Sequence, residues 1–360
     1  MKFTKKSIGV VFLLVAVLSI VTACSGSDHP DYTAQTDVPT PASDGSAASI
    51  PPLDLSGTIQ IDGSSTVFPI TEAIAEEFGI LTAGDVRVLV GISGTGGGFS
   101  KFCNGETEII NASRPVKFSE IERCAEEGID FVEVPVAVDG LSVAVNPDNN
   151  FVDCLTISQL EIMWSEAAEG NVTRWNQVRA DWPDERMRLY GPGVDSGTFD
   201  YFTETVNGEA QSSRGDFISS ENDNVLVQGV SGDKSSLGYF GYSYFHENRD
   251  KLKVVAIDGG SGCVKPTDQT INDGSYAPFS RPLFLYIRTD EAVKPEVLEF
   301  MRFFLSEEGS QLVTEVGYVP LLEETRKLAL SRFEAGKSGS LFGGASPQKG
   351  PIAEVLASNQ

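Results

Sequence analysis

Short strand-like runs alternate with helix-like stretches through the first part of this chain, from about Gly57 to Asn146. The strand-like run at 58–61 is followed by a stretch over 69–79 in which apolar residues recur at helical spacing. Strands that alternate with helices in this way pair mostly in parallel, and the helices pack on the sheet. The alternation therefore predicts an α/β fold.

The remaining elements continue this alternation. In the first part we expect further strands at 86–90, 109–112, 131–138 and 141–145, and helices at 97–104 and 118–127. In the second part we expect helices at 156–163 and 198–207, strands at 187–190 and 253–257, and a turn-rich strand region at 225–245. A strand at 280–287 and helices at 294–306 and 307–315 follow. A chain of 360 residues has room for two domains of this kind.

Residues 1–23 have the pattern of a secretion signal. Three lysines precede the apolar run Ile8–Val21, which is too short for a typical membrane span. Small residues then precede Cys24, as at a bacterial lipoprotein cleavage site, and the polar stretch that follows favours lipid attachment to Cys24 over an ordinary signal peptide. We expect an extracytoplasmic protein anchored to the cell membrane by a lipid, in a periplasm or on the outer face of the cytoplasmic membrane.

Two segments lack the periodicity of folded sequence. Residues 24–56 are rich in Ser, Asp, Ala, Thr and Pro, and we interpret them as a disordered tether between the lipid and the folded part. Residues 336–360 begin with a run rich in Gly and Ser, and we expect a flexible tail.

Charge excludes two classes of partner. The formal net charge is −24 at pH 7, and removal of the signal with its lysines makes it more negative. Such a chain is a poor match for nucleic acid or for anionic lipid. The same charge opposes any anionic ligand, so an anion site would depend on local donors.

Four cysteines follow Cys24, and an even number in an exported chain indicates two disulfides. Three pairings are open. We favour Cys103–Cys124 and Cys154–Cys263, because each bond then stays within one expected domain. The chain has two histidines and lacks a CxxC motif, so the sequence predicts neither a metal site nor a histidine-based catalytic triad, and no cofactor.

The turn Gly63–Ile70 joins the first expected strand to the first expected helix. The first N–H groups of a helix have no partner within the helix, and the helix dipole adds positive potential there. Ser65, Thr66 and Val67 are therefore candidate anion-binding residues. The alternative is that Ser65 or Thr66 only caps the helix.

Two further candidate segments lie in the first part of the chain. Ser93–Phe99 follows a strand and precedes a helix, and its glycines allow backbone N–H groups to approach a ligand; a plain glycine-rich turn is the alternative. Asn111–Pro115 ends a short strand with an arginine that could bind an oxyanion through two N–H groups, or that could simply lie on the surface. The candidate residues of these two segments are Ser93, Thr95, Gly96, Ser113 and Arg114.

A fourth segment, Gly191–Phe199, repeats the chemistry of the first turn in the second part of the chain. Its candidate residues are Asp195, Ser196, Gly197 and Thr198. Here too the alternative is simple capping, in this case by Asp195.

Taken in this order and spacing, the four motifs resemble those of the extracytoplasmic phosphate-binding protein of the high-affinity phosphate ABC importer, the PstS-like substrate-binding proteins. The resemblance covers about 57–322. It implies a type II periplasmic-binding-protein fold with mixed, mostly parallel sheets and a ligand cleft between two lobes. We expect lobe I at 57–145 plus 280–335 and lobe II at 146–279. The implied partners are inorganic phosphate and a membrane permease; we expect a monomer without enzymatic activity.

The chain departs from the best-known branch of that family. That branch has an Asp where this chain has Arg114, and an Arg near the position of Pro192. The resemblance then implies that Arg114 binds the anion and that Asp195 accepts a hydrogen bond from the proton that phosphate carries. Sulfate has no such proton, so Asp195 would repel it.

Three other functions are compatible with parts of this pattern. The first is a binding protein for sulfate or molybdate, against which Asp195 argues. The second is a phosphatase, for which the chain has too few histidines and no serine with a visible base. The third is a phosphate sensor or surface protein, because one fold can serve several functions.

Overall fold

The computed structural model describes residues 55–194, 196–344 and 351–359. These residues all fall in one unit, 51–360. The predicted signal peptide, Cys24 and nearly all of the predicted tether lie outside the described residues, as does Asp195. None of the helices in the described ranges is long and apolar enough to cross a membrane.

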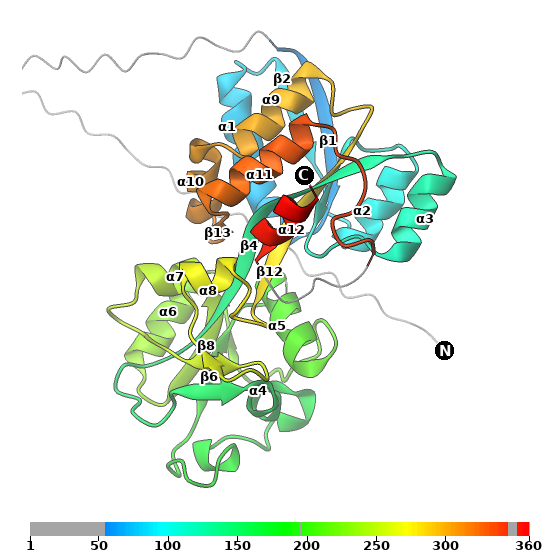
Figure 1. Ribbon diagram of the computed structural model, residues 1–360. Helices are drawn as coiled ribbons and strands as arrows, with labels where there is room; N and C mark the ends of the chain where they lie inside the picture. The colour runs from blue at the N-terminus through cyan, green and yellow to red at the C-terminus, as the bar shows by residue number, and fades with distance from the viewer. Residues whose placement is uncertain (1–54, 195, 345–350, 360) are drawn as a thin grey trace, which may run out of the picture. The chain divides into compact units, whose positions relative to one another are not determined.

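The first strands form the parallel arrangement that the alternation predicts. Strand β1 (Gly57–Gly63) pairs in parallel with β2 (Val86–Val90) on one side and with β3 (Ile109–Ala112) on the other. Helix α1 (Phe68–Leu81) packs on β2, and α2 (Gly94–Cys103) packs on β3. The α/β class is confirmed, and each strand ends at a turn that starts a helix (Figure 1).

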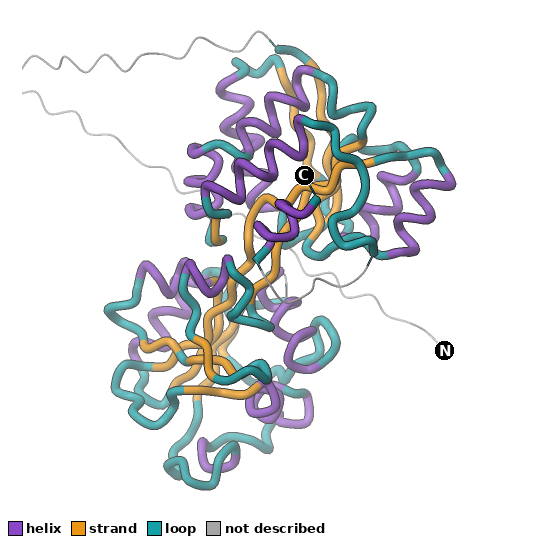
Figure 2. Tube along the Cα trace, in the orientation of Figure 1, coloured by secondary structure: helices purple, strands orange, loops and turns teal. Residues whose placement is uncertain are grey.

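Strand β4 (Phe131–Val145) is a single buried strand where the sequence predicts two. Up to Gly140 it pairs antiparallel with β12 (Ser280–Arg288), and from Leu141 it pairs antiparallel with β8 (Ser236–Gly241). Figure 2 shows β4 and β12 running side by side. The strand continues through Gly140 because Asp139 and Gly140 pair with Arg281 and Ser280 of β12. An added Cβ on Gly140 would lie 2.8 Å from Ile271 Cδ1, so a glycine fits this position.

Beyond β8 the sheet is parallel again. Strand β8 pairs with β6 (Arg188–Gly191), which pairs with β7 (Ile218–Ser219). The resulting sheet is mixed: both ends are parallel, and β4 and β12 supply antiparallel pairs. Strands β9 (Lys253–Val254) and β13 (Val319–Pro320) add short pairings to β4.

The region 225–245 is not the turn-rich strand region that the sequence predicts. It contains α6 (Asp223–Gly232), β8 and α7 (Tyr242–Glu247). Helix α6 buries Leu226, Val227 and Val230, and these positions lie on one face of a helix. The short apolar run is compatible with the period of a helix and with that of a strand. The packing of its buried face on β8 favours the helix.

Both predicted disulfides are confirmed. Cys103–Cys124 joins α2 to α3 (Phe118–Glu126). Cys154–Cys263 joins the two outer strands of a small sheet, which contains β5 (Cys154–Thr156), β10 (Ala256–Asp258) and β11 (Cys263–Val264).

The prediction of a flexible tail over 336–360 is wrong for the residues that the structure describes. Leu341 is buried and its N–H donates to the carboxylate of Glu133 (2.7 Å), and α12 (Ile352–Ser358) buries Ile352 and Leu356. The segment is rich in glycine, and its few apolar residues were therefore not recognised as core residues from the sequence.

The remaining α-helices are α4 (Ile157–Trp164), α5 (Gly197–Asn207), α8 (Asp268–Asn272), α9 (Pro295–Phe304), α10 (Glu307–Glu315) and α11 (Glu323–Glu334).

Candidate anion-binding site

The turn before α1 leaves the start of that helix without a capping side chain. Val67 is the N-cap residue, and among the described residues no side chain makes a capping hydrogen bond there. Neither Ser65 nor Thr66 therefore caps α1. Thr66 is buried, and its N–H donates to Ser64 Oγ (3.2 Å). The start of α1 therefore has no capping side chain, but Phe68 N donates to Ser64 O (3.1 Å) and Pro69 has no N–H, so only part of the usual set of helix-start donors is left for an anion.

The second and third motifs meet each other. Thr95, in the first turn of α2, lies with Oγ1 3.2 Å from Ser113 Oγ and accepts a hydrogen bond from Ser113 N (3.2 Å). An added Cβ on Gly96 would lie 3.9 Å from Arg114 Nη2, so this glycine faces the guanidinium. Ser93 differs from the prediction, because its hydroxyl is bonded to the carboxylate of Asp62.

A glycine further along α2 explains how this helix reaches the first turn. A Cβ on Gly98 would lie 2.7 Å from Gly63 Cα, at the end of β1. No larger residue fits this contact, so Gly98 serves close packing of α2 on the end of β1.

Arg114 is held by a residue that the sequence analysis missed. Its Nη1 and Nη2 lie 2.9 and 2.7 Å from the two carboxylate oxygens of Glu120. Glu120 is the third residue of α3, and its carboxylate also accepts from Lys117 N (2.8 Å). A glutamate three residues after a helix N-cap is the signal that could have identified it. The side chain of Arg114 is 29% exposed, so the guanidinium is oriented but still accessible.

The fourth motif lies against the first. Ser196 caps α5, with Oγ accepting from Thr198 N (3.2 Å), so the capping role belongs to Ser196. A Cβ on Gly197 would lie 2.7 Å from Thr66 Oγ1 and 3.0 Å from Thr66 Cα. The starts of α1 and α5, which are more than a hundred residues apart in the sequence, are therefore in contact.

Comparison with known proteins shows the family of this chain. The family model of the PBP superfamily domain matches residues 41–308. Protein SphX of Synechocystis sp. is 45% identical over 85% of this chain and 90% of its own length. The phosphate-binding protein PstS of Staphylococcus saprophyticus is 40% identical over 74% of this chain and 81% of its own length. The chain belongs to the PBP superfamily, as a PstS-like substrate-binding protein.

A solved structure also aligns with this PstS-like chain. The crystal structure of a possible phosphate binding protein from Planctomyces limnophilus is 48% identical, with a TM-score of 0.74, over 78% of this chain and 99% of the other. The predicted α/β fold of a periplasmic binding protein is thus confirmed.

The PstS-like chain carries a second arginine near the turns. Arg281 on β12 lies with Nη2 3.1 Å from Asp139 Oδ2 on β4 and 3.4 Å from Thr66 Oγ1. Burial raises the pKa of the Asp139 carboxyl, and Arg281 opposes that rise. No sequence pattern indicates this pair, because strand pairing alone makes the two residues neighbours.

Acidic side chains lie beside the fourth motif. A Cβ on Gly193 would overlap with Glu221 Oε1. Asp223 is the first residue of α6, and burial, with a further contribution from Glu221, raises its carboxyl pKa to about 7. In the part of the chain that the structure describes, no cluster of three or more His, Cys, Asp or Glu residues could hold a metal ion.

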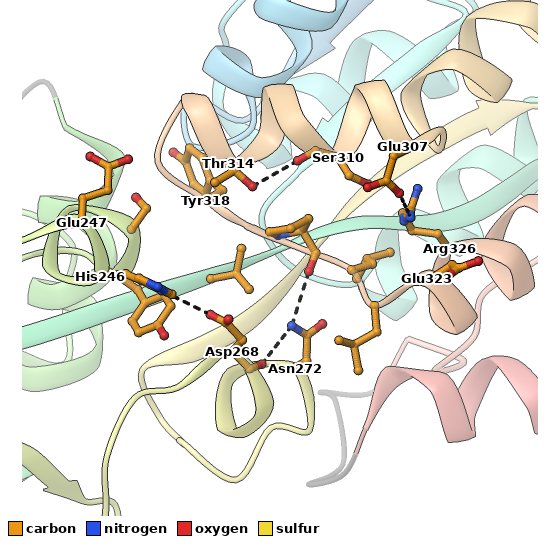
Figure 3. Close-up of a pocket in the computed structure, with 16 residues that line it drawn as sticks. His246, Glu247, Asp268, Asn272, Glu307, Ser310, Thr314, Tyr318, Glu323 and Arg326 are labelled. Atoms are coloured by element: carbon orange, nitrogen blue, oxygen red, sulfur yellow. Dashed lines mark hydrogen bonds and ion pairs between the residues drawn. The ribbon is translucent and has the colours of Figure 1, made fainter. Parts of the chain in front are cut away.

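A pocket of about 590 Å³ beside α7, α8, α10 and α11 contains none of the predicted residues (Figure 3). Two charged pairs line this pocket. His246 Nδ1 lies 3.7 Å from Asp268 Oδ1, and Arg326 Nη2 donates to Glu307 Oε2 (2.8 Å). The turns at α1, α2 and α5 therefore form the candidate site, and this pocket does not.

Proposed function

We propose that this protein binds inorganic phosphate between the N-termini of α1, α2 and α5. The contact of Gly197 with Thr66 carries the proposal, because it joins the uncapped start of α1 to a helix from the other end of the sheet. Two helix starts that converge supply N–H donors and positive potential for one anion. The remaining donors are the hydroxyls of Thr95 and Ser113 and the guanidinium of Arg114.

Phosphate, rather than another oxyanion, is the ligand that this donor set and Asp195 favour together. Near neutral pH phosphate keeps a proton, and a carboxylate can accept a hydrogen bond from it. Sulfate presents only acceptor oxygens, and a carboxylate repels it. The backbone of Ser196, Gly197 and Thr198, with the hydroxyls of Ser196 and Thr198, would complete the set next to Asp195.

Transport is the role that we propose for this binding. High affinity would let the protein capture phosphate outside the cell membrane and deliver it to the permease of an ABC importer. The two proposed lobes, 57–145 plus 280–335 and 146–279, would close on the anion by bending at the strands that join them. Curated relatives named phosphate-binding protein PstS support this role. We propose a monomer that catalyses no reaction.

Calorimetric titration of protein stripped of ligand tests the binding proposal. Phosphate and arsenate should bind tightly, because both are tetrahedral and keep a proton near neutral pH, and sulfate should bind far more weakly. Equal affinity for sulfate would contradict the assigned selectivity, and no heat with phosphate would contradict the function. Turnover of phosphate esters by the purified protein would show an enzyme instead.

Cys24 provides the test of location. We propose that it carries a diacylglycerol group, so the unaltered protein should sediment with membranes and Cys24→Ala should be released. A protein that is soluble with Cys24 intact would contradict the anchor.

A further inference from the structure

Arg281 lies between the two turns of the proposed site. Its Nη2 is 3.4 Å from Thr66 Oγ1, just before α1. Its guanidinium carbon is 3.7 Å from the centre of the Tyr201 ring, in α5. A single side chain from β12 thus contacts a residue on each side of the junction between Thr66 and Gly197.

The surroundings of Arg281 hold its guanidinium in one orientation. Asp139 is its direct cross-strand neighbour and is 4% exposed, and its Oδ2 lies 3.1 Å from Nη2. The Tyr201 ring packs against the cation, and its own hydroxyl donates to Pro278 O (2.5 Å). A buried ion pair adds little stability compared with apolar residues of similar size, so stability alone is a weak explanation for this one.

We propose that Arg281 is a positioning residue of the anion site, a role that rests on the proposed phosphate function. An N–H of Arg281 donates to Thr66 Oγ1, so the hydroxyl hydrogen of Thr66 points away from the guanidinium. That hydrogen is then available to a bound anion. Asp139 balances the charge of Arg281, so Arg281 acts chiefly by orienting Thr66.

A double-mutant cycle on phosphate affinity tests this role. Arg281→Met and Thr66→Val should each weaken phosphate binding by about tenfold, which corresponds to about 1.4 kcal/mol. If Arg281 acts through Thr66, the double variant should be far less than a hundredfold weaker, because the two changes remove one shared function. Additive effects, or an Arg281→Met variant that binds like the unaltered protein, would overturn the inference.

Further variants separate positioning from simple structural support. Asp139→Asn leaves Arg281 on Thr66 and removes the opposing charge, so phosphate affinity should not fall; a fall as large as that of Arg281→Met would mean that only the ion pair matters. Arg302→Met removes an exposed ion pair on α9 and should leave affinity unchanged. If Arg281→Met does not fold, Arg281→Lys replaces it in the cycle, because lysine cannot contact both partners as a planar fork. Absence of phosphate binding by the unaltered protein would instead refute the proposed function itself.

Discussion

Arg114 and Glu120 form a two-point ion pair, in which both terminal nitrogens of the guanidinium contact the carboxylate at 2.9 and 2.7 Å. Glu120 also caps the start of α3, because its carboxylate accepts a hydrogen bond from Lys117 N. The position of Arg114 therefore depends on where α3 begins. In the proposed site Glu120 orients the guanidinium, and Asp195 remains the candidate for recognising the proton of the ligand.

Removal of Arg114 should weaken phosphate binding without changing selectivity. Hydrogen bonds that involve charged groups contribute roughly 1.5–3 kcal/mol, so Arg114→Ala should lower the affinity at least about tenfold. The ratio of phosphate to sulfate affinity should change little. Arg123→Ala, at the other end of α3, is the matched control and should bind normally. Normal binding by Arg114→Ala would show that the arginine is only part of the α3 ion pair.

Asp195→Asn should act on selectivity. The amide keeps the shape of the carboxylate and removes its charge, and it can also donate a hydrogen bond. Phosphate affinity should fall only moderately, because the loss of the hydrogen-bond acceptor is partly offset by the loss of charge repulsion between the carboxylate and the anion. Sulfate affinity should rise, because that repulsion is removed. The affinity ratio from calorimetry is the quantity to follow. An unchanged ratio would mean that a different carboxylate reads the proton; Glu221, next to Gly193, would then be examined.

Gly197→Ala should disturb binding through the contact with Thr66. The new methyl group would lie 2.7 Å from Thr66 Oγ1, and overpacking of this kind costs about 1–3 kcal/mol. Separation of the two helix starts should lower phosphate affinity by about tenfold or more. Gly79→Ala within α1 meets no atom within 4 Å and should bind normally, with a gain in stability of up to about 1 kcal/mol. Unchanged affinity in Gly197→Ala would argue against a site at this contact.

The two disulfides should differ in their contribution to stability. The paired cysteines are 21 residues apart in Cys103–Cys124 and 109 residues apart in Cys154–Cys263. In the loop-entropy account the shorter loop contributes about 3 kcal/mol and the longer one more than 4 kcal/mol. Replacement of each pair by serines, followed by denaturant unfolding, should show the larger loss for Cys154–Cys263. The reverse order would point to strain or to residual structure in the unfolded chain.

Asp223 should make the protein less stable as the pH rises. Its folded pKa of about 7 lies well above the value of about 3.9 for an unfolded aspartate. Between these values the folded state binds more protons, so the contribution of Asp223 to the free energy of unfolding falls from pH 4 to pH 7. Asp223→Asn should therefore gain stability over the unaltered protein progressively across this range.

The matched control for this pH effect is Asp290→Asn. Arg288 holds the pKa of Asp290 below its usual value, so this carboxyl titrates below the range in question. Its replacement should leave the slope between pH 5 and 8 unchanged, because in that range this carboxyl is ionised in both the folded and the unfolded state. Parallel slopes for Asp223→Asn and the unaltered protein would show that Asp223 is ionised throughout.

The sequence alone determined the features that depend on local pattern. Periodicity identified β1, α1 and the alternation that defines the α/β class, because a strand or helix that buries one face must repeat at its own period. Helix starts rich in hydroxyls and glycine indicated the turns that we propose as the anion site. The cysteine pairing was also predicted correctly, from the expectation that each bond stays within one domain.

Tertiary structure decided the features that depend on contacts between distant segments. Strand pairing made Arg281 a neighbour of Asp139, and packing of the turn before α1 placed Thr66 next to it; both residues are more than a hundred positions away. The same pairing kept β4 continuous through Gly140, and packing on β8 made a helix of the ambiguous run in α6. A few buried side chains, such as Leu356, anchored a terminus whose composition is that of a disordered segment. Sequence spacing carries no information about such contacts, because they form only when the sheet brings separate segments together.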